Sequence, residues 1–528
     1  MSTIKSIPMA LAERVKSIPN ETFFLFNGEN HSYKSVDEVS NRVANALAEL
    51  GVKQSDNVCT ILNNNMESVF AFFAVQKLGA VYVPINIQIE DAQVKHIINN
   101  CETEYLIIEA DILPRVQGML GELPKLANII VKGEGEAPKL EGRNTSKFDA
   151  LFSGKSSPID TQTIETDLAC LLYTSGTTGP PKGVMLSHAY YIAGGELFVK
   201  VLGESEKGIF YSSLPFYHIM GQIQGIIAPL MAGAAAAVSE KFSVSRFWDQ
   251  IRETKATCTC MTGTQVTYLY QSAPKDNDAD NTLRIIAAFP VPQDTADGFE
   301  KRFDLKLRNV YGLTEALLPI IAMYDGPYKE GALGLPTDYE VRIADDADNE
   351  VADLEIGNII LRPISTSRRV FDGYYKMPET TLEMLRHCWF HTGDMGYRDA
   401  DGFLWFASRK KDIIRFRGEN ISAPRIESVV CSHDKVLECA AVGVPSEVGE
   451  EDIKIVVILE PGQTLAPENL LDHCAEQIAW FMVPRYVEYV ESLPKTATDK
   501  VEKFKLKKDW KTVATWDREV ASYKVKKK

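Results

Sequence analysis

A short polar stretch between Tyr173 and Val184 carries the residue types and spacing best suited to chemistry. Hydroxyls and backbone amides can donate to phosphate oxygens, glycines allow close approach of the backbone, and a lysine adds a positive charge. The apolar run directly before the stretch predicts a buried strand, so these residues would form a loop at a strand end. An ordinary Gly/Ser/Thr hairpin is the alternative. The predicted phosphate loop comprises Thr174, Ser175, Gly176, Thr177, Thr178, Gly179, Lys182 and Gly183.

The spacing of this loop argues against a P-loop kinase. A Walker A loop has four residues between its first glycine and a Gly-Lys-Ser/Thr that opens a helix. Here Gly176 and Gly179 are followed by Pro180, Pro181 and Lys182, and two prolines would disturb such a helix start. The loop therefore indicates a different class of nucleotide-binding protein.

A second pattern, Tyr-Gly-Leu-Thr-Glu at residues 311–315, follows a predicted strand at 309–310. Tyr311 offers a flat face for a purine, and Gly312 allows a sharp turn. Thr314 offers a hydroxyl to a phosphate, and Glu315 offers a hard carboxylate oxygen that suits Mg²⁺. Taken alone, the pattern also fits a strand end with a solvated glutamate.

A third pattern is Trp-Phe-His-Thr-Gly-Asp at residues 389–394. An aspartate on a glycine turn at a sheet edge can accept hydrogen bonds from the vicinal hydroxyls of a ribose. Asp394 is therefore a candidate ribose ligand, with a turn-capping aspartate as the alternative.

Together these patterns resemble the AMP-forming adenylating enzymes, a superfamily of acyl-CoA synthetases, peptide-synthetase adenylation domains and firefly-type luciferases. The resemblance covers roughly residues 30–510 in five ordered motifs, and it looks closest to the carnitine/crotonobetaine-type CoA ligases. It implies that the predicted phosphate loop binds ATP, with Thr178 among the catalytic residues. It also implies that Glu315 holds the metal and that Asp394 and Arg409 lie against the ribose.

The remaining two motifs lie near the C-terminus. The resemblance implies that Lys411 is a hinge and that Arg417 and Gly418 lie near the acyl phosphate and the pantetheine tunnel. It also implies that Lys500 bridges the carboxylate and the α-phosphate. Two positions depart from the family pattern: Arg425 stands where a glutamate is usual, and Asp499 where a glycine is usual.

The resemblance also implies a pocket for an acid substrate. Phe289 is bulky where the family commonly has a small residue, which favours a small or medium acid over a long fatty acid. Alternatively, His218 is a core histidine whose hydrogen bonds are made within the protein. The predicted acid pocket comprises His218, Met220, Gly263, Thr264, Phe289 and Leu318.

The expected reaction joins a small-molecule carboxylic acid to coenzyme A, using ATP and Mg²⁺ through an acyl adenylate. Two alternatives remain open. An adenylating enzyme that delivers its acyl group to a carrier protein or another acceptor would share every motif. A non-catalytic nucleotide-binding or scaffold protein would not exchange pyrophosphate in response to an acid.

Composition restricts the partners. The chain has 528 residues, is 45% hydrophobic and carries a net charge of −15, which argues against nucleic-acid binding. It contains no run of roughly 18 apolar residues, so we expect no membrane span and a cytoplasmic location. Nine cysteines without a Cys-x-x-Cys pair indicate reduced thiols and no zinc site. A homodimer is compatible with the resemblance.

The elements that must position these residues alternate between strands and helices, which predicts an α/β fold with a parallel sheet. The chain changes character after Arg409, and we expect a boundary at Lys411 between residues 1–410 and a compact unit at 411–528. The resemblance implies stacked α/β sheets and a β-barrel-like subdomain in the first domain, and a small mobile α+β second domain. Polar residues near 131–164 predict a connector, and alternation at 340–362 predicts an antiparallel meander. Strands are expected near 58–62, 81–85, 105–109, 169–173, 211–215, 234–238, 284–289, 440–444 and 453–459, and helices near 35–50, 66–78, 92–98, 244–253, 266–271 and 466–480.

Overall fold

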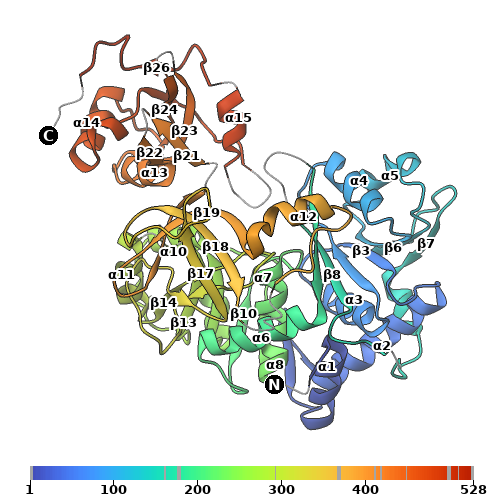
Figure 1. The fold of residues 1–528 in the computed structure, drawn as a ribbon. Helices are drawn as coiled ribbons and strands as arrows, with labels where there is room; N and C mark the ends of the chain where they lie inside the picture. Colours follow the sequence, from blue (N-terminus) through green and yellow to red (C-terminus); the bar gives the residue numbers. More distant parts are fainter. Residues whose placement is uncertain are drawn as a thin grey trace. The chain divides into compact units, whose positions relative to one another are not determined.

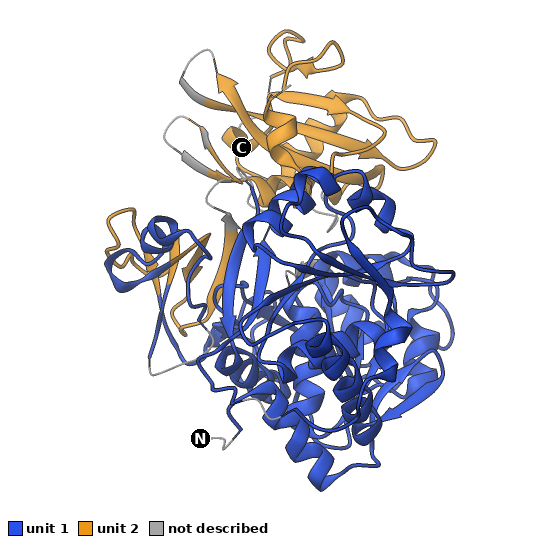
Figure 2. Cartoon of the chain, turned by 90° about the vertical axis from the view of Figure 1, so that its right-hand side faces the viewer, with its two compact units in different colours: residues 1–341, 361–390 blue, residues 342–360, 391–528 orange. Residues whose placement is uncertain are grey.

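The computed structural model describes residues 4–159, 162–174, 180–289, 291, 293–364, 370–409, 412–416, 419–446, 449–495, 501–508 and 510–524. The chain divides into two compact units, which Figure 2 shows in different colours. Unit 1 comprises residues 1–341 and 361–390, and unit 2 comprises residues 342–360 and 391–528.

The first sheet of unit 1 has seven strands in the order β7-β6-β5-β3-β4-β8-β9 (Figure 1). Neighbouring strands are parallel except β8 and β9, which form an antiparallel hairpin. The strands are β3 (Asn57–Ile61), β4 (Val81–Pro84), β5 (Tyr105–Glu109), β6 (Asn128–Lys132), β7 (Asn144–Lys147), β8 (Leu168–Thr174) and β9 (Lys182–Ser187).

Helices cover both faces of this sheet, which explains why its central strands are apolar throughout. Helices α4 (Asp91–Asn100) and α5 (Leu113–Gln117) share a core with one face. On the other face Phe72 of α3 (Met66–Lys77) packs edge-to-face on Tyr82 of β4, and α2 (Tyr33–Glu49) packs on α3.

The expected connector at 131–164 is wrong in part. It contains the edge strand β7 and the 3-10 helix η2 (Phe148–Ser153). Strand β7 reads Asn-Thr-Ser-Lys, and its side chains are exposed or half-buried, so its sequence has no apolar pattern that could reveal a strand.

The second sheet of unit 1 has nine strands in the order β16-β15-β14-β13-β12-β10-β11-β1-β2. The strands from β14 through β1 are parallel, and the pairs at both ends are antiparallel. The strands are β1 (Thr22–Phe26), β2 (Glu29–Ser32), β10 (Ile209–Ser212), β11 (Ala235–Val238), β12 (Cys258–Thr262), β13 (Ile285–Phe289), β14 (Lys306–Tyr311), β15 (Ile320–Ile321) and β16 (Leu335–Pro336).

Helices also cover this second sheet. One group packs on it around Phe247, Trp248, Phe299 and Phe303. These helices are α9 (Phe247–Thr254), α10 (Gly263–Gln271) and α11 (Gln293–Phe303). A second group lies against β10, β11 and β13 and packs together through small residues such as Gly194 and Gly195. It comprises α1 (Ile7–Ser17), α6 (His188–Leu202), α7 (Ile219–Gln222), the π-helix η3 (Ile223–Ile227) and α8 (Ala228–Ala232).

A third sheet has four strands in the order β17-β18-β19-β20 and includes the meander predicted at 340–362. Its strands are β17 (Tyr339–Ala344), β18 (Gly357–Pro363), β19 (Phe390–Arg398) and β20 (Leu404–Arg409), and α12 (Pro378–Met384) precedes β19.

The rest of unit 2 is α+β. Strands β21 and β22 form a hairpin, and the last sheet has the order β23-β24-β25-β26. Helices α13 and α14 share a core with these strands. The elements are β21 (Ile413–Phe416), β22 (Glu419–Ser422), α13 (Ala423–Cys431), β23 (Val436–Ser446), β24 (Gly449–Leu459), α14 (Pro467–Gln477), β25 (Tyr486–Tyr489), α15 (Lys503–Lys508) and β26 (Trp516–Asp517).

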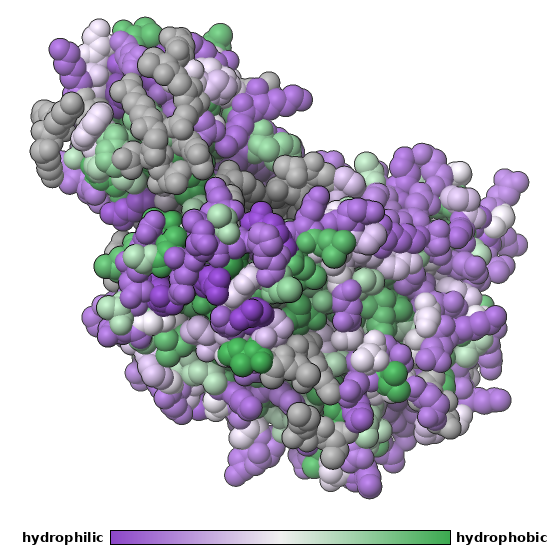
Figure 3. All heavy atoms as spheres, in the orientation of Figure 1, coloured by the Kyte–Doolittle hydropathy of each residue, from purple (hydrophilic) through white to green (hydrophobic). Residues whose placement is uncertain are grey.

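The exposed surface matches the charged composition. Hydrophilic residues cover most of the face shown in Figure 3, and hydrophobic residues are scattered among them. Within the described ranges, no helix combines the length and the apolar character that a bilayer crossing requires.

Candidate active site

The predicted phosphate loop joins the two strands of the β8–β9 hairpin. Thr174 ends β8, Lys182 begins β9, and the two residues are partners in the antiparallel register. The hairpin therefore brings both ends of the loop together at one edge of the first sheet. Ser175, Gly176, Thr177, Thr178 and Gly179 lie outside the described residues.

An extended segment at residues 370–375 links this hairpin to the Tyr-Gly-Leu-Thr-Glu pattern. On one side, Met185 donates to the Gly373 carbonyl at 3.0 Å and Tyr375 donates to the Gly183 carbonyl at 2.8 Å. On the other side, Phe371 donates to the Glu315 carbonyl at 2.9 Å. Gly373 has φ +111°, a conformation that other residues rarely adopt. The backbone thus connects two motifs that are distant in sequence, since Gly183 and Glu315 are 132 residues apart.

Glu315 is fixed through its side chain as well. The Tyr374 hydroxyl donates to Glu315 Oε1 at 2.7 Å. Burial, followed by the Glu315 charge, raises the pKa of Tyr374 far above its usual value, so the hydroxyl stays protonated and remains a donor. The carboxylate is half-buried, next to a tyrosine that cannot move without breaking this contact.

Lys182 contacts the ring of the same tyrosine. Its Nζ is 5.1 Å from the centroid of the Tyr374 ring, within the range of a cation–π interaction. A loop lysine, an aromatic ring and a carboxylate are therefore in contact within unit 1. We call Lys182, Tyr374 and Glu315, with the β8–β9 hairpin, the nucleotide side.

The residues present fit Mg²⁺ bound together with a nucleotide. Within the described part of the chain there is no group of three or more His, Cys, Asp or Glu side chains placed to hold a metal. Mg²⁺ is commonly held by one or two carboxylates, with water and substrate phosphates completing its octahedron. A single carboxylate at Glu315 beside a phosphate loop matches this mode of binding.

The turn after β14 is tightly built. A Cβ atom at Gly312 would lie 2.8 Å from the Leu318 backbone nitrogen, so only glycine fits there without movement. The Tyr190 hydroxyl of α6 donates to the Thr314 carbonyl at 2.8 Å. Tyr311 is 1% exposed, and its ring packs edge-to-face on Phe289 at 5.5 Å. Its predicted contact with a purine stays a prediction, and it would require this packing to open.

The residues of the predicted acid pocket lie where the parallel strands of the second sheet end. Thr262, just before Gly263, is the register partner of Phe289, and β14 next to them ends at Tyr311. The carboxyl ends of parallel strands are the usual location of ligand sites in α/β folds. Gly263 and Leu318 are buried, His218, Met220 and Phe289 are half-buried, and Thr264 is exposed.

Two buried amides hold the loop that carries His218. Asn64 donates from Nδ2 to the Leu214 carbonyl at 2.9 Å and accepts from the Phe216 amide at 2.9 Å. Gln222 donates from Nε2 to the Phe216 carbonyl at 2.7 Å. These contacts also explain why the strand expected at 211–215 ends at Ser212, since the backbone beyond it bonds to side chains rather than to a neighbouring strand.

The start of α10 presents Gly263 and Thr264. Its N-cap Thr262 accepts from the Gln265 amide at 3.3 Å, and the Gln265 side chain accepts from the Thr262 amide at 3.0 Å. This reciprocal capping box fixes the point where the chain leaves β12.

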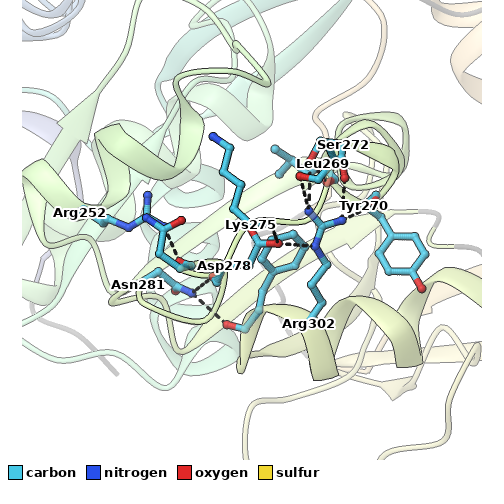
Figure 4. A network of polar contacts seen from close by, with 11 residues as sticks. Arg252, Leu269, Tyr270, Ser272, Lys275, Asp278, Asn281 and Arg302 are labelled. Atoms are coloured by element: carbon cyan, nitrogen blue, oxygen red, sulfur yellow. Dashed lines mark hydrogen bonds and ion pairs between the residues drawn. The ribbon is translucent and has the colours of Figure 1, made fainter.

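Arg302 of α11 anchors the other end of α10, as Figure 4 shows. Its Nη1 donates to the carbonyls of Tyr270 at 2.6 Å and Ser272 at 2.9 Å, and its Nε donates to Asp278 at 2.7 Å. Burial raises the pKa of Asp278, but the Lys275 amide and the Arg302 guanidinium together lower it below its usual value. One guanidinium therefore satisfies the carbonyls at the end of α10 and a buried carboxylate.

The candidate ribose ligands belong to unit 2. Asp394 of β19 and Arg409 of β20 are register partners in one hairpin, and the Asp394 amide donates to Thr392 Oγ1 at 3.0 Å. The structure thus places both residues side by side on the backbone. Lys411, Arg417, Gly418 and Lys500 lie outside the described residues, and their predicted roles stay predictions.

Four positioning residues were missed by sequence reasoning: Asn64, Gln222, Arg302 and Tyr374. Asn64, Arg302 and Tyr374 act on residues distant in the chain, whereas Gln222 acts on the nearby Phe216, and none of the four belongs to a phosphate, metal or ribose pattern. The only local signal was at Tyr374, where Gly-Tyr-Tyr interrupts a polar stretch. That signal fits a strand or a turn equally well.

The family described as "AMP-binding enzyme" matches residues 11–375, and the family described as "AMP-binding enzyme C-terminal domain" matches residues 425–500. Among curated proteins, the crotonobetaine/carnitine–CoA ligase of Salmonella agona (strain SL483) is 31% identical over 485 residues. That alignment covers 90% of this chain and 93% of the relative.

Solved structures agree with these matches. The anthranilate CoA ligase AuaEII in complex with anthranoyl-AMP has a TM-score of 0.85 at 29% identity, covering 94% of this chain and 96% of that one. ATP-bound MatB from Rhodopseudomonas palustris has a TM-score of 0.85 at 25% identity, covering 96% of this chain and 99% of that one. The α/β fold expected from the sequence and the resemblance to adenylating enzymes are confirmed. Because the first family match spans most of the chain, this protein belongs to the AMP-binding enzyme family.

Proposed function

We propose that this protein is an AMP-forming acyl-CoA ligase that activates a small or medium carboxylic acid with Mg-ATP and passes the acyl group to coenzyme A. The ligase class is supported by membership of the AMP-binding enzyme family and by curated CoA ligases that match 90% of the chain. ATP, Mg²⁺ and coenzyme A belong to that class. The size of the acid is our own inference.

The observation that carries the proposal is the nucleotide side. Lys182 and Glu315 both contact Tyr374, and Lys182 lies at one end of the predicted phosphate loop. A cation suits the phosphates of ATP, and a carboxylate suits the metal that accompanies them. Phosphoryl and nucleotidyl transfer depend mainly on such positioned charges.

In the first half-reaction, a carboxylate oxygen of the acid attacks the α-phosphorus. The bond to the bridging oxygen breaks and pyrophosphate leaves, so no proton transfer is needed. Lys182 and the hydroxyls of Thr177 and Thr178 bind the departing phosphates, and Lys500 stabilises the charge that develops at the attacked phosphorus. Glu315 would hold Mg²⁺, which would supply positive charge to the departing pyrophosphate.

In the second half-reaction, the sulfur of coenzyme A attacks the acyl carbonyl, the thiol proton is released and AMP leaves. The proposed roles are contact with the pantetheine arm for Arg417 and Gly418 and contact with the ribose for Asp394 and Arg409. The proposed domains are residues 1–410 and 411–528, with Lys411 as the hinge. This division is supported by the two family matches, which end at 375 and resume at 425.

A small or medium acid is supported by Phe289 and by the relatives. Phe289 ends β13 and is half-buried beside Tyr311, where it would shorten the acid pocket. The curated relative is a ligase of crotonobetaine and carnitine, and a solved neighbour is a ligase of anthranilate. All three are compact acids. The proposal covers acids of this size as a class and does not name one acid as the substrate.

The experiment is a screen for pyrophosphate release over short aliphatic, dicarboxylic and aromatic acids, followed by mass spectrometry of the product. We expect release with one class of acid and a coenzyme A thioester as the product. Release without a thioester would favour delivery to a carrier protein or another acceptor. No release with any acid would favour a non-catalytic nucleotide-binding protein.

The proposed location is the cytoplasm, because ATP and coenzyme A are available there, and localisation of a tagged chain tests it. The proposed assembly is a homodimer, which light scattering of the purified protein tests directly.

A further inference from the structure

Tyr374 contacts both charged groups of the nucleotide side, Lys182 through its ring and Glu315 through its hydroxyl. We propose that Tyr374 is a positioning residue that orients the Glu315 carboxylate toward the metal and restrains Lys182, so that the two are set before Mg-ATP binds. This inference rests on the proposed function and names a residue that belongs to none of the predicted motifs.

The same short segment fixes both ends of Glu315. Phe371 donates its amide to the Glu315 backbone carbonyl at 2.9 Å, and the Tyr374 hydroxyl donates to Oε1 at 2.7 Å. A glutamate has three rotatable side-chain bonds, and holding one carboxylate oxygen restricts them together. A metal ligand oriented in this way loses less freedom when the metal binds.

Tyr374 is itself held firmly. It is 5% exposed, it forms an isolated β-bridge with Val184, and its amide donates to Thr381 Oγ1 at 2.9 Å. Its ring packs edge-to-face on Phe371 with 5.0 Å between centroids. Because the backbone and the ring of Tyr374 are both fixed, the side chain keeps one rotamer and the hydroxyl oxygen keeps one position.

Lys182 contacts the ring rather than the carboxylate. With Nζ 5.1 Å from the ring centroid, the ammonium gains cation–π attraction on a buried surface. The ring therefore holds the ammonium close to Glu315 when no nucleotide is bound. The phosphates of ATP need the lysine as a cation and the metal needs the carboxylate as an anion, so a direct ion pair would oppose both functions.

The adjacent tyrosine offers a matched control. Tyr375 is half-buried, packs against the core of the first sheet, and has Lys376 Nζ 5.2 Å from its ring centroid. Tyr375 therefore resembles Tyr374 in residue type and in its lysine contact, whereas the hydrogen bond to Glu315 comes from Tyr374.

The experiment compares Tyr374→Phe with Tyr375→Phe in the full chain. Tyr374→Phe keeps the ring over Lys182 and removes only the hydroxyl. The readout is the affinity of the ATP-bound protein for Mn²⁺, measured by electron paramagnetic resonance, with the KM values for Mg-ATP and for the acid alongside. We expect Tyr374→Phe to weaken Mn²⁺ binding about 10-fold and to leave the KM of the acid unchanged. Tyr375→Phe should bind Mn²⁺ like the wild type.

Equal Mn²⁺ affinity in Tyr374→Phe and the wild type would overturn the proposal. So would equal weakening in both tyrosine variants, since that would indicate a general loss of stability. A third variant, Tyr374→Leu, removes the ring as well as the hydroxyl. It should therefore weaken the binding of metal-free ATP in addition to the binding of Mn²⁺. Failure of the proposed function would look different, because the wild type would then bind Mn²⁺ and ATP but show no acid-dependent pyrophosphate exchange.

Discussion

The nucleotide side and the predicted acid pocket lie in the same unit but are held in different ways. The nucleotide side is fixed largely by backbone pairing: a hairpin, an extended segment between two motifs, and one tyrosine hydroxyl. The acid pocket is fixed by side chains that reach backbone groups from other elements, namely Asn64, Gln222 and Arg302. Backbone pairing tolerates substitution of the side chains, whereas a side-chain clamp is lost with one mutation. The acid pocket should therefore be the region that single substitutions alter most selectively.

Helix α6 supports both regions through two consecutive tyrosines. The Tyr190 hydroxyl donates to the Thr314 carbonyl on the nucleotide side, and the Tyr191 hydroxyl donates to Gln222 Oε1 in the acid pocket at 2.5 Å. The two regions thus have separate local supports and one shared helix. Variants can be designed that change one region, the other, or both.

The largest expected effect is on adenylation. Lys500→Ala should slow adenylation about 10²–10³-fold with every acid, because one positioned cation at the attacked phosphorus is lost. It should spare thioester formation from a supplied acyl adenylate. Single-turnover assays of each half-reaction measure this, with the exposed Lys508→Ala as control. Equal loss in both half-reactions would refute the division of labour between them.

A smaller and more selective effect is expected in the acid pocket. Gln222→Leu removes the donor to the Phe216 carbonyl, so the His218 loop should shift and the KM of the acid should rise about 10-fold. The KM of ATP should stay unchanged, which steady-state kinetics with each substrate varied will show.

Gln224→Leu is the matched control for this variant. Gln224 is also fully buried, but its Nε2 donates to the Tyr211 carbonyl at the end of β10 instead of the His218 loop. Both variants should lose about 2 kcal/mol of stability. If both variants raise the KM of the acid equally, the effect of Gln222→Leu comes from a general loss of stability and not from a shift of the His218 loop.

Arg302 tests whether α10 is positioned from its far end. Arg302→Leu breaks a buried ion pair and frees the last carbonyls of α10, so it should cost about 3 kcal/mol of stability and raise the KM of the acid a few-fold.

Arg252→Leu is the control for this variant. It removes contacts to the Asn277 and Asp280 carbonyls in the same network and should cost about 1 kcal/mol of stability without changing the KM of the acid. Denaturant unfolding and acid kinetics separate the two outcomes.

The smallest effect concerns the shared helix. His188 of α6 is fully buried and accepts from the Ile7 amide at 3.3 Å, and burial, partly offset by Asp167, lowers its pKa to about 4. An unfolded histidine has a pKa near 6.5, so the unfolded chain binds more protons between those values and stability is lost as pH falls. Between pH 7.5 and 5.5 the loss should be about 1 kcal/mol.

Denaturant midpoints of the wild type and His188→Gln across this pH range measure that loss. The loss of stability between pH 7.5 and 5.5 should be about 1 kcal/mol smaller in His188→Gln than in the wild type. A variant that loses stability with pH as steeply as the wild type would show that His188 is not the group responsible.

The sequence was sufficient for the parts of the site whose chemistry is local. Strand β8 and the loop residues that follow it are consecutive, and Glu315 lies in a five-residue pattern of its own, so the residue types within each pattern predict a phosphate loop and a metal ligand. Parallel strands could be predicted because apolar runs alternate with amphipathic helices. Each of these features is determined by neighbours within a few residues.

The contacts that hold the site could not be predicted in the same way. Asn64 and Phe216 are 152 residues apart, and Tyr374 and Glu315 are 59 apart, so no local pattern relates them. Buried amides such as Gln222 look like ordinary helix residues in sequence. The edge strand β7 was missed because its residues are polar, although its backbone pairs with β6.

The most direct test of the central claim is exchange of labelled pyrophosphate into ATP without coenzyme A, with and without an activating acid, in the wild type and in Glu315→Gln. We predict exchange in the wild type only when the acid is present, and a reduction of about 10²-fold in the variant with every active acid. Exchange that does not depend on an acid, or a variant as active as the wild type, would contradict the claim that the nucleotide side activates a carboxylate.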